Sequence, residues 1–340
     1  MSETPERAPL RVTISDVAAA AGVSRATATR ALKGEGRFSE STRERILEIC
    51  ARLGYVPNTM AAELAAGRTG TVGLMLRDAS NPAYGLLFSR LQDEAHARGL
   101  DLVTVTIGAD TGGTKQVTAL QRLLGMRVAG LIVATGGVTN EQLMPFADQV
   151  PILRAGRDET GDRIHAVAYD EHAHGELLAQ HIHALGHRRV AVLATDPVAS
   201  FPEHVRATAM REWLEAAGAN VVAVPVGAAP EDGVADVLAL ASAGRITAVL
   251  CSSDYRQLAV LRAARAAGLD VPGDLSVTGC DGILPGADLL GLTTVRIPVE
   301  QVARGAIEAI QHLLDTGEDT VVRRSHAGPL VPGATAAPLS

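Results

Sequence analysis

The chain has 340 residues, of which 47% are hydrophobic and only 3% aromatic, and its formal net charge is −7 at pH 7. This length predicts two or three cores, filled mainly by Ala, Val and Leu. The three cysteines lack motif spacing, which argues against a disulfide framework. The sequence has no signal-like segment and no run of 18 apolar residues, which argues against export and a membrane span. We therefore expect a soluble cytoplasmic protein.

The charge is unevenly distributed along the chain. Residues 1–68 contain ten Lys or Arg and eight Asp or Glu, whereas the remainder contains 21 and 30. A weakly basic head on an acidic body predicts that only the head contacts nucleic acid. The first ten residues are polar and are expected to be disordered.

Residues 13–34 predict two short helices joined by a turn. Ile14, Val17 and Ala21 share one helical face, Gly22 ends it, and the Ser24 hydroxyl is suited to cap a second helix. This pattern is typical of a helix-turn-helix, whose second helix places its first residues against base edges in the major groove. Those residues are Ser24, Arg25, Ala26 and Thr27, with Arg30 one turn later.

A surface pair of helices without nucleic acid is the alternative. From Arg11 to Arg37 five basic residues stand against two acidic ones, a local excess that favours contact with phosphates. A third helix after Ser39 is expected to complete a small core with Ile46 and Ile49. Pro57 ends this unit, and the Ala-rich stretch 59–67 predicts either a short hinge helix or a plain linker.

From Thr71 onward, strand-like and helical segments alternate. The first series predicts strands at 71–76, 101–107 and 128–134, with helices at 84–98 and 114–125. The second predicts strands at 190–194, 220–226, 246–251 and 275–279, with helices at 203–217, 231–243 and 255–267. Such alternation predicts α/β lobes with parallel sheets and a ligand cleft at the carboxyl ends of the strands. Ser80, Ser253, Asp254 and Asp281 fall at such ends.

Together these segments resemble the LacI/GalR (lactose-repressor/galactose-repressor) family of bacterial transcription regulators over about residues 11 to 325. The most specific matches are in the head, at 12–18, 21–27 and 54–58. Supporting motifs are Ser80-Asn81-Pro82, Gly186-His-Arg-Arg189, Asp274-Leu-Ser-Val-Thr-Gly-Cys-Asp281 and Leu292-Thr-Thr-Val295. The resemblance implies a helix-turn-helix domain over 11–57, a hinge helix over 58–68 and a periplasmic-binding-protein-like effector domain over 69–330.

For the head, the resemblance implies a homodimer on near-palindromic double-stranded operator DNA, most simply as a repressor. Arg25, Ala26 and Arg30 match the base-reading residues, whereas Ser24 and Thr27 match phosphate contacts. Leu64 matches the hinge leucine that inserts into the minor groove. An apolar wedge of this kind bends DNA and gains contact area.

For the body, the resemblance implies one lobe of about 69–167 plus 298–318, a second of about 168–297 plus 319–330, and a tail over 331–340. It implies a small effector between the lobes, of sugar or nucleoside type. Arg206 and Asp281 match effector-contacting residues, with a surface salt bridge and a turn aspartate as the respective alternatives. The other expected pocket residues are Ser80, Tyr84, Arg157, Ser253 and Asp254. The tail has no leucine heptad, which favours a dimer over a tetramer.

Three other interpretations are weaker. Six histidines lie between His165 and His187; we expect them on a solvated face rather than at a metal, because no ligand set is complete. An α/β enzyme would need a catalytic motif, yet the phosphate-loop, dinucleotide and nucleophile-elbow patterns are missing, and the pairs Asp93-Glu94 and Asp158-Glu159 are expected to be exposed. A transport solute-binding protein would lack residues 13–66. We therefore expect no catalytic residue, metal or cofactor.

Overall fold

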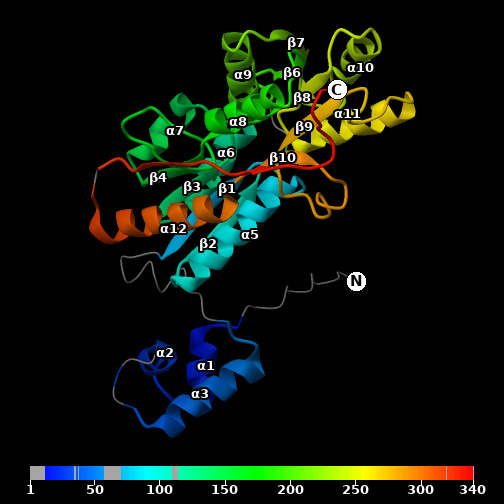
Figure 1. Ribbon diagram of the computed structural model, residues 1–340. Coiled ribbons are helices and arrows are strands. Elements are labelled where there is room, and N and C mark those ends of the chain that lie inside the picture. Colours follow the sequence, from blue (N-terminus) through cyan, green and yellow to red (C-terminus); the bar gives the residue numbers. More distant parts are fainter. Residues whose placement is uncertain are drawn as a thin grey trace, which may run out of the picture. The chain divides into compact units, whose positions relative to one another are not determined.

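The computed structural model describes residues 12–33, 36, 38–56, 70–108, 114–318 and 320–339 (Figure 1). The chain forms two compact units, Met1–Thr69 and Gly70–Ser340. The expected disordered segment 1–10 and the hinge helix over 58–68, with Leu64, lie outside the described residues. No described helix is both long enough and apolar enough to cross a membrane.

The described residues of the first unit form three helices, as the sequence predicts: α1 (Ile14–Ala21), α2 (Arg25–Lys33) and α3 (Glu40–Leu53). Thr13 and Asp16 form a reciprocal cap on α1, and Gly22 ends the helix with a φ of 63°. The hydroxyl of Ser24 accepts the Thr27 N–H at 3.1 Å, which starts α2. The apolar faces meet in a core of Val17, Ala21, Ala31, Ile46, Ile49 and Cys50.

The second unit contains two six-stranded sheets, each flanked by helices (Figure 1). The first sheet is entirely parallel, in the order β11-β5-β4-β3-β1-β2. Its strands are β1 (Thr71–Leu76), β2 (Asp101–Thr106), β3 (Gly130–Ala134), β4 (Ile152–Ala155), β5 (His165–Tyr169) and β11 (Arg323–His326). The helices of this lobe are α5 (Pro82–Ala97), α6 (Thr114–Gly125), α7 (Asn140–Ala147) and α12 (Val299–Thr316).

The second sheet has the order β12-β10-β9-β8-β6-β7, and only β12 runs antiparallel. Its strands are β6 (Arg189–Thr195), β7 (Asn220–Val226), β8 (Ala248–Leu250), β9 (Ser276–Asp281), β10 (Thr293–Arg296) and β12 (Leu330–Val331). Its helices are α8 (Glu171–Ala184), α9 (Phe201–Ala216), α10 (Val234–Ser242) and α11 (Asp254–Ala266). The two-lobed α/β fold is therefore confirmed.

The lobe boundaries expected near the C-terminus need correction. Strand β11 pairs with β5 in the first sheet, whereas residues 319–330 were expected in the second lobe. The chain thus passes between the lobes after β5, after β10 and after β11. The tail packs on the second lobe, because the Thr335 carbonyl accepts the Val277 N–H at 2.7 Å and the Leu339 N–H donates to Leu185 at 2.8 Å.

Two expectations about exposure are wrong. His165, His174 and His187 are buried, each with a specific hydrogen-bond partner, so the six histidines do not form one solvated face. Glu159 is also buried inside the first lobe, where its carboxylate accepts the Arg154 Nε–H at 2.7 Å. Sequence spacing shows polarity, but it does not show which polar groups find a buried partner.

Helices α8 and α9 pack closely at Gly175. A Cβ atom at this position would lie 2.4 Å from the Arg206 carbonyl oxygen and 2.9 Å from the Ala209 Cβ. Glycine therefore permits an approach between helix backbones that any larger residue obstructs. This contact fixes the position of α9 against α8, and α9 carries Arg206.

We expect Gly175→Ala to lower the free energy of unfolding by about 1–3 kcal/mol, since the added methyl meets a backbone atom that cannot rotate away. Urea denaturation of the full chain measures the change. Gly125→Ala is the matched control, because nothing lies within 4 Å of a Cβ there. A loss of stability that is equal in the two variants would contradict this account of α8 and α9.

Candidate functional site

The start of α2 presents polar and basic groups on the surface of the first unit. Ser24, Arg25, Ala26 and Arg30 are exposed and Thr27 is partly exposed. The hydroxyls of Ser24 and Thr27 lie 2.8 Å apart, and Arg30 Nε donates to the Ala26 carbonyl at 3.3 Å. No acidic residue occupies the first turn. A helix N-terminus with exposed arginines favours contact with an anionic backbone.

A cavity of about 160 Å³ lies between the two lobes of the second unit. First-lobe residues on its wall include Tyr84, Thr135, Arg157 and Tyr169, and second-lobe residues include Glu171, Glu203, Arg206, Ser253, Arg256 and Asp281. Several of them lie at the ends of β3, β4, β5, β8 and β9 or within three residues after them. The cavity therefore lies at the carboxyl ends of the strands, where parallel sheets bind ligands.

The structure brings together five of the seven residues expected at the effector site. Tyr84, Arg157, Arg206, Ser253 and Asp281 line the cavity. Ser80 and Asp254 do not line it. The hydroxyl of Ser80 is exposed and donates to Asp78 at 2.8 Å, whereas Asp254 is 1% exposed behind the wall.

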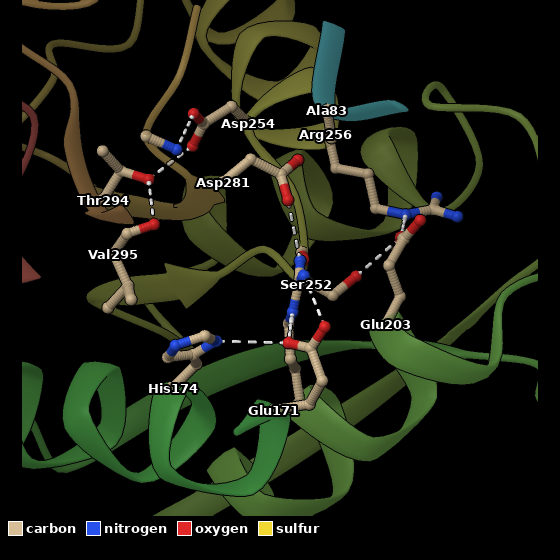
Figure 2. Close-up of polar contacts among 12 residues, drawn as sticks. Ala83, Glu171, His174, Glu203, Ser252, Asp254, Arg256, Asp281, Thr294 and Val295 are labelled. Carbon is tan, nitrogen blue, oxygen red and sulfur yellow. Dashed lines mark hydrogen bonds and ion pairs between the residues drawn. The ribbon is translucent and has the colours of Figure 1, made fainter. Parts of the chain in front are cut away.

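Arg206 is the most heavily bonded residue of the wall. Its Nε and Nη2 donate to the two carboxylate oxygens of Glu171, the latter at 2.9 Å. Its Nη1 donates to the Ser252 carbonyl at 2.9 Å and to Asp281 Oδ1 at 3.0 Å (Figure 2). This guanidinium therefore joins α8, the segment after β8 and the end of β9.

A second buried pair extends this network. Glu203 accepts from Arg256 Nε at 2.8 Å and from the Ser252 hydroxyl at 2.9 Å (Figure 2). The other Arg256 nitrogens donate to the carbonyls of Ala229 and Gly227. Ser252 thus bonds to both pairs, through its carbonyl and its hydroxyl.

Asp254 supports Asp281 from behind. Its carboxylate accepts the Thr294 hydroxyl at 2.6 Å and the Gly282 N–H at 2.7 Å (Figure 2). Asp281 has a φ of 124°, a region that favours glycine. Such strain persists only where surrounding contacts hold it, and it is concentrated at functional sites.

The carboxyl groups of this cluster differ in pKa. Burial raises the pKa of Asp281 to about 8, despite the nearby Arg206, and raises that of Asp254 to about 6, despite its two hydrogen bonds. Burial acts on Glu171 in the same direction, but the charge and hydrogen bonds of Arg206 outweigh it and lower the pKa. Arg206 gives two donors to Glu171 and one to Asp281, so Glu171 keeps its charge more readily.

Two contacts join the lobes beside the cavity. The Arg157 guanidinium lies 4.2 Å from the centre of the Phe201 ring, and it donates to the carbonyls of Gly136 and Val138. Arg77 Nη2 donates to the Ala199 carbonyl at 3.0 Å. Phe201 is the first residue of α9 and Ala199 lies in the segment just before it, so this end of α9 contacts the first lobe.

Sequence reasoning missed Glu171, Glu203, Arg256 and Tyr169. Glu203 had a usable signal, because it precedes Arg206 by three residues and such positions share one helix face. Glu171 and Tyr169 were missed because β5 was not predicted. Among the described residues, no group of three or more His, Cys, Asp or Glu is arranged to hold a metal ion.

Comparison with known proteins identifies both units. Residues 13–58 match bacterial regulatory proteins of the lacI family, and residues 179–336 match a periplasmic binding protein-like domain. The chain is 30% identical to the HTH-type transcriptional regulator DegA of Bacillus subtilis over 301 residues, which cover 86% of this chain and 88% of DegA. This chain belongs to the lacI family. The HTH-type transcriptional regulator GalR of Escherichia coli is 31% identical over 89% of each chain.

Solved structures confirm the fold. The lac repressor dimer bound to operator and the anti-inducer ONPF matches with a TM-score of 0.82 at 23% identity, over 96% of this chain and 100% of that one. A complex of the transcriptional regulator CelR with cellobiose matches with a TM-score of 0.68 at 27% identity, over 96% and 100%. This lacI-family member is therefore a DNA-binding transcriptional regulator with a periplasmic-binding-protein-like domain.

We expect the unfolding free energy to fall between about pH 6.5 and 8.5, and to fall less in Asp281→Asn. The Asp281 carboxyl has a folded pKa of about 8 against an ordinary 3.8, so its stabilising proton is present at low pH and is lost as pH rises through 8. His187 has a lowered pKa, so its contribution to the unfolding free energy is complete above its ordinary pKa of 6.5 and does not change further in this pH range. Urea unfolding at three pH values measures the slope; parallel slopes would refute this assignment.

Proposed function

We propose that this chain is a repressor that binds a near-palindromic operator as a homodimer, under control of a small sugar or nucleoside-like effector. The observation that carries the proposal is a cavity walled by both lobes, with Arg206 and Asp281 bonded to each other on its surface. Arg25, Ala26 and Arg30 would read bases, Ser24 and Thr27 would contact phosphates, and Leu64 would insert at the operator centre. The protein acts by binding in the cytoplasm and performs no catalysis.

Control follows from the two-lobed construction. A ligand that contacts Tyr84 and Arg157 on one lobe and Ser253 and Asp281 on the other favours the lobe arrangement that closes around it. An effector shifts the equilibrium only by its difference in affinity for the two arrangements. One arrangement would place two hinge segments so that they fold together on the operator, and the other would separate them.

A homodimer is supported by apolar residues of the second lobe. Leu289 and Leu290 are consecutive and are 89% and 56% exposed. Large exposed apolar side chains that adjoin one another are typical of a contact surface. The repressor named above was crystallised as a dimer on its operator, and a two-fold protein matches a two-fold site.

We expect Arg25→Ala to relax sequence preference at one base pair of each half-site, at a cost of about 1–3 kcal/mol. The operator is first located by footprinting DNA that flanks the chain's own gene, and binding is then measured to all single-base variants. Arg45→Ala is the matched control, because it removes the same charge from an exposed position on α3. An equal and sequence-independent loss in both variants would rule out base reading by Arg25.

We expect Arg206→Lys and Asp281→Asn each to weaken effector binding by about tenfold or more, since charge-assisted bonds in the cavity are lost. A thermal-shift screen of sugars and nucleosides identifies a ligand, and calorimetry measures its affinity. Glu215→Gln serves as the control, because Glu215 is exposed on the same helix as Arg206. Unchanged affinity in both pocket variants would remove these residues from the site.

A further inference from the structure

The second-lobe wall of the cavity holds more negative than positive charge around Arg206. This one guanidinium bonds to Glu171 and Asp281, and Asp254 lies directly behind Asp281 with only a hydroxyl and a backbone N–H as partners. Glu203 forms its ion pair with Arg256 and not with Arg206. Three carboxyl groups therefore share one cation.

No other described group near Glu171 supplies the missing positive charge. His174 Nδ1 lies 3.2 Å from Glu171, but His174 Nε2 accepts the Gly328 N–H at 2.8 Å. A ring nitrogen that accepts a hydrogen bond carries no proton, so His174 is neutral and donates through Nδ1. Buried carboxyl groups without a cation are costly, and they either hold a proton or recruit positive charge.

This wall offers a ligand acceptor oxygens that no described protein group uses. Arg206 and Arg256 direct every nitrogen to a protein oxygen. In the described part of the chain, Asp281 Oδ2 and Glu203 Oε1 have no hydrogen-bond partner. The Tyr169 hydroxyl is also buried without a partner, and Tyr169 is 7% exposed on the same cavity.

Arg157 does not pair with the carboxyl groups at Arg206. Its guanidinium donates to two first-lobe carbonyls and lies over the Phe201 ring. Carbonyl oxygens and the face of an aromatic ring both stabilise a cation. Its Nη1 is thus occupied by protein oxygens and its Nε is buried without a partner, and among the described residues Arg157 forms no ion pair with the carboxyl groups at Arg206.

We propose that the effector is a hydroxylated amine, of which amino sugars are the simplest, and that Glu171 and Asp281 select its ammonium group. The ammonium donates to Asp281 Oδ2 and places a positive charge beside the two carboxyl groups that share Arg206. Hydroxyl groups of the ligand donate to Glu203 Oε1 and pair with the Tyr169 hydroxyl. This inference rests on the proposed effector function and adds the charge of the ligand to it.

Calorimetry of the full chain with matched ligands tests the proposal. The probes are D-glucosamine, D-galactosamine and D-mannosamine, each against its parent hexose, with D-glucose 6-phosphate as the anionic probe. Each pair differs by one ammonium in place of one hydroxyl. We expect at least one amino sugar to bind about tenfold or more tightly than its parent, and the phosphate ester not to bind.

Glu171→Gln keeps the shape of the side chain and removes one negative charge, so it should reduce the ratio of amino-sugar to hexose affinity by about tenfold. Asp281→Asn should reduce this affinity ratio by a similar factor. Circular dichroism checks that each variant folds, and two variants are used so that the failure of one to fold does not remove the test. Glu215→Gln, exposed on α9, should leave the ratio unchanged.

Equal or tighter binding of the parent hexose in every pair, binding of the phosphate ester, or no binding by any amino sugar at millimolar concentration would overturn the proposal. An unchanged ratio in both folded pocket variants would do the same. Operator binding by the unmodified chain is measured separately. A chain that binds operator but prefers neutral sugars would refute only the ligand charge, whereas a chain without operator preference would refute the proposed function.

Discussion

The buried guanidinium of Arg206 is the constraint on which the second lobe depends. A buried cation must be paired and hydrogen-bonded, and Arg206 finds its partners on α8, after β8 and at the end of β9. These segments are far apart in the chain, so the requirement fixes their relative positions. Gly175 allows α8 to approach the Arg206 carbonyl, and Glu203, one turn earlier on α9, consequently reaches Ser252 and Arg256.

The same helix links the cavity to the lobe arrangement. The first residue of α9, Phe201, contacts Arg157, and the helix then supplies Glu203 and Arg206 to the cavity wall. Arg77 and Arg157 contact this region from the first lobe. A ligand that alters the position of α9 therefore alters the contacts that hold the lobes together.

The second-lobe wall of the pocket leaves acceptor oxygens to a ligand. Two arginines line its second-lobe wall, yet protein oxygens occupy their nitrogens, and oxygen atoms of Asp281, Glu203 and Tyr169 remain for a ligand. Asp254 holds the strained end of β9 through Gly282. Gln257 donates to the carbonyls of Val277 and Thr293 and to the Thr335 hydroxyl, which fastens the tail to the second sheet. Asp254 and Gln257 both lie behind the cavity wall, and neither lines the cavity.

The sequence by itself determined the helix-turn-helix, the caps at Ser24 and Ser39, the two α/β series and the family, because these features depend on local spacing and on motifs. It also placed Arg206 and Asp281 in one site. It did not show that Asp254 lies behind the wall, that Glu159 and three histidines are buried, or that β11 returns to the first sheet. Only the tertiary structure decided these points, since burial depends on how separate elements pack, as with Glu171 and Asp281, which come from different elements and both bond to Arg206.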